Sequence, residues 1–471
     1  MPNLTQLRIA AREIFNETLR AVDARAAVWR AVRLEDSRLI VCDATIDIGD
    51  QKVYSIAIGK AAFAMAAALN EILGEKLTAG ITTSNAAWYR TGSGPGSPGG
   101  QPAWGGGCDR VNLASKWRAF QGGHPEPNDE SLAAAQACFD LLQRADQEGA
   151  IVIFLISGGG SAMIEWPINE DISLSDLRAA NKALINCGAS ITEINAARRA
   201  FSAVKGGRLA ARAPHCDQIT LIVSDVPPGE ERNVASGPTL APPRDAPDAR
   251  QVIARYDLRS QLPETILRVI DTETDASKLF SDSGLTRKHF VLLDNRSELD
   301  AAAEAAGRRG FIIEISRDIS DQSIEEGCSL LVAHLDHLRA CATDEESRSN
   351  AENSVCLISG GEFACPVRGD GVGGRNLETA LRLACATSQK PGTEHFVALC
   401  VGTDGIDGNS PAAGAIVDST TIGRARAIGL DPQDFLDRSD AYSFFVALGD
   451  AVATGPTGTN VRDIRILLAS A

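Results

Sequence analysis

The sequence lacks the cysteine patterns that would indicate a zinc site or a disulfide framework. Its eleven cysteines are scattered, with no CxxC pair and no CxxH arrangement. Structural zinc sites and small disulfide-stabilised domains both depend on such spacings. We therefore expect reduced thiols, most of them buried.

Long apolar runs and an excess of basic residues are also missing. No run approaches the roughly 18 apolar residues that a membrane helix requires. The chain has 46 Lys and Arg against 61 Asp and Glu, a net charge of −15, whereas a nucleic-acid surface needs clustered basic residues. The N-terminal segment has apolar residues near helical spacing and carries Glu13, Glu17 and Asp23, unlike an acid-free transit peptide. These features predict a cytoplasmic protein with no nucleic-acid or membrane partner.

The pattern of short apolar runs predicts an α/β fold. Segments such as VYSIAI, AIVIFLI and FVALCVG lead into glycines or turns and then into helical patterns. Buried strands of this kind are typical of layered domains with largely parallel sheets. Ligands in such folds bind outside the carboxyl ends of the strands, so we expect the glycine-rich loops to form the binding site.

The length of 471 residues favours two domains. A composition shift at APPRDAPDARQ and a new strand near Phe290 suggest where they divide. We predict a Rossmann-like α/β domain over residues 1–245, a connecting helical segment over 246–284, and a second α/β domain over 285–471. A Gly, Pro and Ser tract between Ala86 and Gly107 is predicted to be a surface loop or insertion of unknown role.

Two glycine-rich turns in the first half are candidates for phosphate binding. Lys60 follows Gly59 between the strand YSIAI and the helix AAFAMAAAL, and the amides of a helix N-terminus favour anions. A solvated surface lysine is the alternative. The loop Ser157, Gly158, Gly159, Gly160, Ser161 follows IVIFLI, where glycines allow backbone amides to approach a polyphosphate. A merely tight turn would have the same composition.

A basic stripe follows in NCGASITEINAARRAFSAVKGGRLA. Asn195, Arg198 and Lys205 are spaced by three and seven residues, which places them near one face of a helix. Facing a cleft, these side chains could hold a carboxylate and phosphates. A solvated helix face is the alternative.

Carboxylates recur at predicted strand ends. Asp225 follows ITLIV, a usual place for a magnesium ligand or a catalytic base, although it could simply cap a helix. Gly361 and Glu362 follow VCLIS, Gly374, Arg375 and Asn376 open the helix LETALRLA, and Thr403, Asp404 and Asp407 follow FVALCVG. Several carboxylates beside an arginine suit phosphoryl transfer, which needs metal, a guanidinium and a base. The two Asp-Gly pairs could also be ordinary turns.

Several signatures of other chemistries are absent. No predicted strand leads directly into a GxGxxG dinucleotide fingerprint, which argues against hydride transfer. The GxxxxGK[ST] phosphate-binding pattern is absent as well. No GxSxG nucleophile motif occurs. His124 in GGHPEPND fits a rigid turn better than a catalytic base.

Taken in order, these motifs resemble the glycerate 2-kinase family, whose C-terminal half is called the MOFRL domain. The resemblance runs through AIGKAA, GGHPEPND, LISGGGSA, GASITEINAARRAFSAVKGGRLA, SDVPPGEERNVASGPT, ISGGEFACPVRGDGVGGRNLETAL, GTDGIDGNSPAAGAIVD and TGPTGTNVRDIRI. It covers nearly the whole chain from Tyr54 onward.

The resemblance implies phosphorylation of D-glycerate at its 2-hydroxyl, with ATP and Mg²⁺, in a cleft between two α/β domains. Lys60 and Arg375 would be catalytic, and Asp225 would act as base or metal ligand. The loop from Ser157 to Ser161, with Asn195, Arg198 and Lys205, would hold substrate or phosphate. The implied nucleotide-binding residues are Gly361, Glu362, Gly374, Asn376, Thr403, Asp404 and Asp407. Asp225, Glu362 and Asp404 are the candidate metal ligands.

The sequence departs from the family pattern at Leu377, where an amide is usual, at Glu230, where Asp is common, and at Asn128, where an acid is frequent. The alternatives are a hydroxypyruvate reductase, which should carry a dinucleotide fingerprint, and a non-catalytic sugar-acid or nucleotide sensor, which should have lost the charged residues. We expect a monomer or a homodimer.

Overall fold

The computed structural model forms two compact units. It describes residues 3–85, 113, 115–243, 245–272, 285–342, 354–388, 390 and 392–470, so the predicted surface tract between Ala86 and Gly107 lies outside the described residues. The first unit comprises the described residues of 24–293, and the second unit comprises residues 3–23 and the described residues of 294–470. In the part of the chain that is described, no helix is both long and apolar enough to cross a membrane.

The first unit is built on a six-stranded parallel sheet in the order β6-β5-β4-β7-β8-β9. Every residue of β4 and β7 is buried, which is why these segments are continuous apolar runs rather than alternating ones. The strands are β4 (Val53–Ile58), β5 (Leu77–Ser84), β6 (Trp117–Gln121), β7 (Ile151–Ser157), β8 (Asp217–Val223) and β9 (Arg287–Leu293). A small antiparallel sheet precedes them, with β1 (Val32–Glu35), β2 (Arg38–Val41) and β3 (Ala44–Asp47).

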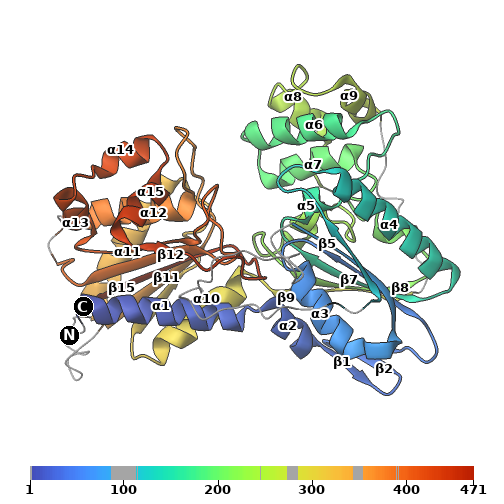
Figure 1. The fold of residues 1–471 in the computed structure, drawn as a ribbon, viewed down its shortest axis with the longest axis horizontal. Coiled ribbons are helices and arrows are strands. Elements are labelled where there is room, and N and C mark those ends of the chain that lie inside the picture. Colours follow the sequence, from blue (N-terminus) through green and yellow to red (C-terminus); the bar gives the residue numbers. More distant parts are fainter. Residues whose placement is uncertain are drawn as a thin grey trace, which may run out of the picture. The chain divides into compact units, whose positions relative to one another are not determined.

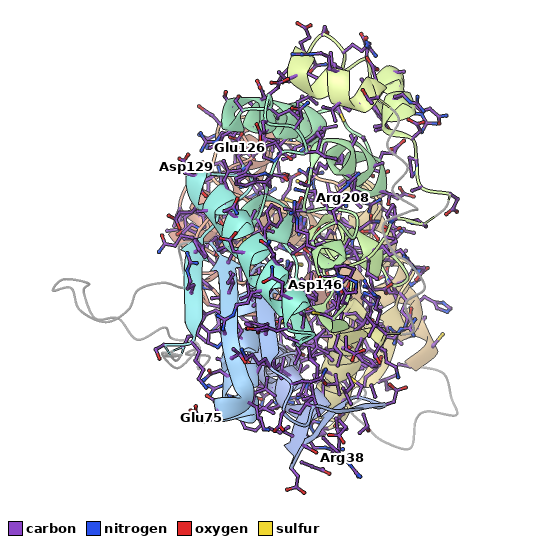
Figure 2. The ribbon with its side chains drawn as sticks, turned by 90° about the vertical axis from the view of Figure 1, so that its right-hand side faces the viewer. Arg38, Glu75, Glu126, Asp129, Asp146 and Arg208 are labelled. Atoms are coloured by element: carbon purple, nitrogen blue, oxygen red, sulfur yellow. The ribbon has the colours of Figure 1, made fainter. Side chains whose placement is uncertain are left out.

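Helices cover both faces of this sheet. α4 (Asp129–Gln147) packs its Ala, Cys and Leu residues against Ile56, Ile81 and Phe154; Asp129 and Asp146 mark the two ends of this helix in Figure 2. Its N-cap Asn128 accepts a hydrogen bond from the Ser131 amide, so the amide side chain that departs from the family pattern acts as a helix cap. The remaining elements near the sheet are α2 (Ala24–Ala31), α3 (Ala62–Leu73), η1 (Gly74–Lys76), α5 (Gly160–Met163), η3 (Ala210–Arg212) and η4 (Glu231–Ser236).

Four further helices form a separate hydrophobic cluster in the same unit. Phe201 and Leu177 are fully buried in it together with Ile266. Figure 1 shows the four helices grouped beyond the end of the strands near α5. They are α6 (Leu174–Asn186), α7 (Ile191–Phe201), α8 (Ala249–Arg255) and α9 (Glu264–Asp271).

The second unit has a mixed six-stranded sheet in the order β10-β11-β15-β12-β13-β14. Only the β10–β11 pair is parallel among its described pairs, because β15 runs antiparallel to both β11 and β12. The largely parallel sheet predicted for both domains is therefore found in the first unit alone. The strands are β10 (Ile312–Ser316), β11 (Ser354–Gly361), β12 (Phe396–Gly402), β13 (Gly414–Asp418), β14 (Ala451–Val452) and β15 (Asp463–Ser470).

Two helical layers enclose the second sheet (Figure 1). α1 (Leu4–Ala21) and α10 (Asn295–Gly307) pack on one face with Ile358 and Ile466. On the other face, Leu357 and Leu467 pack with the remaining helices. These helices are α11 (Ile324–Ala342), α12 (Arg375–Thr387), α13 (Thr421–Ala427), α14 (Pro432–Asp437) and α15 (Ala441–Leu448).

The two units divide the chain differently from the predicted ranges. The N-terminal helix α1 belongs to the second unit, where Arg8 donates to Asp418 over 2.5 Å and also pairs with Asp450. Strand β9 pairs with β8 in the first unit, although the predicted second domain begins at residue 285. A strand's partner is set by tertiary pairing, which a change in composition does not reveal.

We predict that Phe15→Ala destabilises the second unit, because Phe15 is fully buried between α1 and the sheet. Truncating a buried Phe costs about 3–5 kcal/mol. Hydrogen exchange measured by mass spectrometry should speed up in β12 and β15 but not in β4. The control is Ile9→Ala, since Ile9 lies on the same helix and is 51% exposed. Equal exchange in the two variants would contradict the placement of α1.

Candidate active site

The first unit brings two glycine-rich turns together where the order of strand addition reverses. From β4 the chain continues to β5 and β6 on one side, and from β7 it continues to β8 and β9 on the other. The carboxyl ends of the neighbouring strands β4 and β7 therefore flank a topological switch point, which is where open α/β sheets bind ligands. Lys60 follows β4 and the loop Ser157–Ser161 follows β7.

Close backbone contact joins these two turns. Gly59 has φ +113°, and a Cβ there would lie 2.3 Å from the carbonyl oxygen of Ser157, so no larger residue fits. The amide of Lys60 donates to the Gly158 carbonyl over 2.9 Å. The Ser157 hydroxyl accepts from the Ala61 amide at 3.0 Å and donates to the Ile58 carbonyl at 3.2 Å. The hydroxyl of Ser157 thus holds the turn together.

The sequence predicts that Lys60 lies in the first turn of a helix, but in the structure it lies two residues before α3. The helix begins at Ala62, because Gly59 takes a positive φ and the next two residues complete a turn. The side chain of Lys60 packs along the glycine loop, since a Cβ at Gly159 would meet its Cγ at 3.1 Å. The aliphatic part of Lys60 thus lies against the loop, while its role in binding phosphate stays a prediction.

The glycine loop is fixed on its other side by the segment 233–237. A Cβ at Gly160 would lie 2.8 Å from the Cβ of Ala235. The Ser161 and Ser236 hydroxyl oxygens are 2.8 Å apart, and Ser236 donates to Asn195 Oδ1 over 2.7 Å. Because Ser236 has one hydroxyl proton, Ser161 is the donor of the first bond. A continuous relay therefore connects the loop to α7.

This relay depends on unusual backbone conformations. Ala235 and Ser236 both have positive φ values, +50° and +63°, which residues with a Cβ rarely adopt. Asn195 Nδ2 donates to the Asn233 carbonyl over 3.3 Å, and Arg199 donates to the Asn233 side chain over 2.7 Å. Strained backbone persists where the surroundings hold it in place, and these bonds provide that support.

The basic stripe is buried, which makes the predicted alternative of a solvated helix face wrong. Arg198 is 8% exposed; it donates to Asn181 Oδ1 over 2.8 Å, and burial lowers its pKa to about 10. Lys205 lies beyond the end of α7 at Phe201, so the three residues do not share one helix face. The ammonium of Lys205 pairs with the buried carboxylate of Glu165, which occupies it within the protein.

Asp225 is half-buried two residues beyond the end of β8. It does not cap the next helix, since η4 begins at Glu231 with Glu230 as its N-cap residue. The predicted capping alternative is therefore wrong, and the carboxylate stands at the carboxyl edge of the parallel sheet.

The second unit holds its own charged cluster around Arg375. The register pairs Asp463, the first residue of β15, with both Gly361 of β11 and Gly402 of β12. Arg375 donates to Asp463 at 2.5 and 3.2 Å and pairs with Glu362 at 2.9 Å. Burial lowers the pKa of the Arg375 guanidinium, but these two carboxylates more than offset that effect and hold it above its usual value.

Asp407 acts on the helix that carries Arg375. Its two carboxylate oxygens accept the amides of Asn376 at 3.1 Å and Leu377 at 2.8 Å, and a Cβ at Gly374 would lie 2.4 Å from its Cγ. Asp407 therefore satisfies the first turn of α12, and Leu377 contributes its amide although its side chain departs from the family pattern. Burial raises the pKa of Asp407 to about 7, although the Leu377 amide opposes the shift.

Hydrogen bonds between side chains and backbone hold the loops near this cluster. The Thr403 hydroxyl donates to the Arg462 carbonyl over 2.7 Å and accepts the Val461 amide over 2.9 Å. Gly361 has φ +82° and donates its amide to Asn295 Oδ1 over 3.1 Å. Asp404 accepts the Ile406 amide over 3.1 Å through Oδ1, so the Asp-Gly pairs do form turns.

Each unit has carboxylates of the kind that bind a magnesium ion together with phosphate. A metal site made wholly of protein ligands would require a cluster of three or more His, Cys, Asp or Glu side chains. The described residues contain no such cluster. Mg²⁺ instead commonly takes one or two carboxylates and fills its other positions with water and phosphate oxygens. Asp225, Glu362 and Asp404 are half-buried carboxylates at strand ends and can serve in this way.

The structure sorts the predicted residues into two sets and adds others. Lys60, Asp225 and the glycine loop belong to the first unit, and Arg375 belongs to the second. Sequence reasoning missed Asp463 and Ser236. Both residues lie in motifs quoted for the family resemblance, Asp463 in TNVRDIRI and Ser236 in ASGP. Their roles could not be predicted because their partners are far away in the sequence.

Comparison with known proteins assigns both halves of the chain. Residues 10–271 match the family described as a domain of unknown function, DUF4147, and residues 355–463 match the MOFRL family. The D-glycerate 2-kinase of Thermotoga maritima is 32% identical over 416 residues, which cover 88% of this chain and 90% of the relative. The glycerate 2-kinase of Pyrococcus horikoshii is 31% identical, covering 98% and 97% of the two chains. The crystal structure of the glycerate kinase from Thermotoga maritima superposes with a TM-score of 0.75 at 30% identity, over 99% of this chain and 100% of that one.

We predict that Gly59→Ala is more destabilising than Gly149→Ala. Both glycines have positive φ, but a Cβ at Gly149 meets nothing within 4 Å, whereas one at Gly59 would overlap Ser157. Gly149→Ala should cost about 1 kcal/mol from backbone strain alone. Gly59→Ala should cost several times more, because the junction of the two turns must open. Denaturant unfolding compares the two, and equal midpoints would contradict the close contact.

Proposed function

The chain belongs to the glycerate kinase family, and from this premise we propose that it is a D-glycerate 2-kinase, transferring the terminal phosphoryl group of ATP to the 2-hydroxyl of D-glycerate. The observation that carries the proposal is the junction of Lys60 with the glycine loop at the switch point of a parallel sheet. This arrangement supports binding of a phosphorylated ligand there, because it places a cation beside a glycine-rich turn at strand ends.

In this proposal the first unit supplies Lys60 as the group that offsets negative charge on the transferred phosphoryl group. Phosphoryl transfer involves little covalent chemistry by the protein, so positioning and charge stabilisation provide most of the rate. The relay through Ser161, Ser236 and Asn195 positions the glycine loop. Asn195 and the half-buried Ser161 are the polar groups proposed to approach substrate, whereas Lys205 and Arg198 are paired inside the protein with Glu165 and Asn181.

Arg375 supplies a second cation, directed by Asp463 and Glu362. A guanidinium held by two carboxylates keeps a fixed orientation, so it can meet the substrate carboxylate or a phosphate without first reorganising. The loops at Gly361, Gly374, Asn376, Thr403 and Asp407 are proposed to shape the nucleotide site, with Asp407 acting through the α12 N-terminus.

Asp225 is proposed to accept the proton of the attacking hydroxyl or to bind the metal ion. When bound, Mg²⁺ neutralises charge on the phosphate oxygens. Glu362 and Asp404 are the further candidates to hold it. A cytoplasmic location and a monomeric or homodimeric state remain predictions from the sequence.

The activity assay incubates the protein with D-glycerate, ATP and Mg²⁺ and identifies the product by phosphorus NMR. We expect 2-phosphoglycerate, and Lys60→Ala should lower kcat by about 10³-fold, as for other groups that neutralise a transferring phosphoryl. The control is Lys52→Ala, since Lys52 lies just before the same strand but pairs with Glu148 at the surface.

Formation of only 3-phosphoglycerate would overturn the regiochemistry. No ADP release with any hydroxy acid would favour the sensor alternative. Oxidation of NADH or NADPH with hydroxypyruvate would favour the reductase, although the chain lacks the glycine spacing that a dinucleotide turn requires.

We further predict that Asp463→Asn lowers kcat by about 10- to 100-fold, the size expected when a charge-assisted hydrogen-bond pair is lost. Arg375→Gln should be at least as impaired, and the double variant should be no worse, because the two residues act as one unit. The control is Asp437→Asn, whose carboxylate lies exposed on α14. Multiplying effects in the double variant would show that Asp463 does not act through Arg375.

A further inference from the structure

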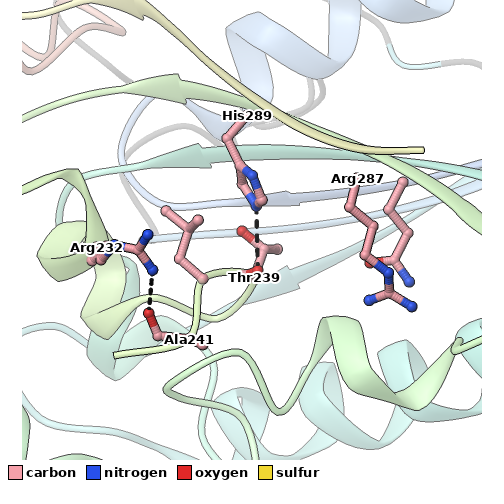
Figure 3. A pocket seen from close by; sticks show the side chains of 7 residues that line it. Arg232, Thr239, Ala241, Arg287 and His289 are labelled. Carbon is pink, nitrogen blue, oxygen red and sulfur yellow. Dashed lines mark hydrogen bonds between the residues drawn. The ribbon is translucent and has the colours of Figure 1, made fainter. Parts of the chain in front are cut away.

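A cavity in the first unit lies away from the glycine loop, between strand β9 and the segment 232–241 (Figure 3). Its volume is about 210 Å³, and no residue predicted for the active site lines it. Its lining residues are Gln218, Arg232, Thr239, Leu240, Ala241, Arg287 and His289.

The charge of this cavity is opposite to that of the whole chain. Two arginines and a histidine line it, and none of its seven lining residues is acidic, although acidic residues outnumber basic ones by 61 to 46. Figure 3 shows Arg232 and Arg287 on opposite sides, with His289 between them. A concentration of cationic side chains around one hollow attracts anions, because a cavity focuses their field.

Backbone contacts fix these side chains in place. Arg232 donates to the Ala241 carbonyl over 2.6 Å, and Arg287 donates to the Pro214 carbonyl over 3.1 Å. A guanidinium is planar with five N–H donors, so a bond to a carbonyl orients the whole group. His289 Nε2 lies 3.3 Å from the Thr239 carbonyl. The cavity is thus preorganised, which reduces the entropy lost on binding.

Burial adds a reason for an anion to bind here. Desolvation lowers the pKa of Arg287 and of His289, which means that the surroundings disfavour their positive charge. An anion placed between them would offset this cost. The second described cavity, of about 530 Å³, contrasts with this one, because it includes Asp140 and its Arg212 stacks on Phe139.

We propose that this cavity is a binding site for a small anion bearing a phosphate or carboxylate group. The two guanidinium groups bind the anionic oxygens, His289 donates a further hydrogen bond when protonated, and Leu240 and Ala241 contact the ligand's carbon atoms. The site does not depend on the proposed catalytic activity.

Binding at this cavity would stabilise a segment that also supports the glycine loop. The carbonyl of Arg232 accepts a bond from Arg199, and Ser236, four residues later, bonds to Ser161. The backbone that carries the cavity's Arg232 and Thr239 therefore also carries the strained residues Ala235 and Ser236. An anion that fixes Arg232 reduces the mobility of this segment.

The test is calorimetric titration of the full chain with inorganic phosphate at constant ionic strength, together with hydrogen exchange of peptides covering residues 157–161 and 232–241. Arg232→Gln/Arg287→Gln should weaken one phosphate site by about tenfold or more and abolish the phosphate-dependent protection. The control is Lys288→Gln, since Lys288 is the intervening residue of β9 and faces the opposite side of the sheet. Phosphate binding that persists in Lys60→Ala identifies this site rather than the glycine loop.

Unchanged affinity and protection in the double variant would overturn the proposal. So would the absence of saturable binding at millimolar phosphate, or protection confined to residues 157–161 in every variant. If the double variant has a lower melting temperature, the single variant Arg232→Gln, at an exposed position, is used to compare phosphate affinity and protection instead. Titration with acetate then distinguishes a carboxylate site from one that requires phosphate.

Discussion

The contact between Gly59 and Ser157 is the constraint on which the first unit's site depends. The turns after β4 and β7 meet so closely that only a glycine with a positive φ can occupy position 59. This approach allows the Lys60 amide to bond to Gly158 and the Ser157 hydroxyl to bond to both sides of the junction. The lysine is held beside the glycine loop because neither turn can move without the other.

The relay from Ser161 through Ser236 to Asn195 extends that constraint to the basic helix α7. Burial of Arg198 restricts this helix and burial of Lys205 restricts the segment after it, because each cation is held by a hydrogen-bonding partner inside the protein. Removing one partner of a buried pair leaves an uncompensated charge, which costs more than the pair itself contributes. Arg198 and Lys205 are therefore held in fixed positions inside the first unit.

The second unit also holds a cation near the ends of strands, but in a sheet of different topology. Its site cation, Arg375, begins a helix whose N-terminus is capped by Asp407 from a distant loop. The antiparallel strand β15 inserts Asp463 between the ends of β11 and β12, which directs the guanidinium. The similar segments ISGGGS and ISGGE both lie at strand ends, but Gly158 follows the last residue of β7, whereas Gly360 and Gly361 are still paired within β11.

The sequence by itself determined the layered α/β class, the apolar strands β4, β7, β8, β11 and β12, and the glycine-rich loops, because apolar periodicity and glycine placement are local properties. It also identified Lys60, Asp225 and Arg375 as strand-end or helix-start charges. Only the tertiary structure decided that α1 packs in the second unit, that β9 joins the first sheet, that β15 runs antiparallel, and that Lys205 pairs with Glu165. Each of these depends on partners far apart in the chain, and pairing across such distances is fixed by packing and register rather than by local sequence.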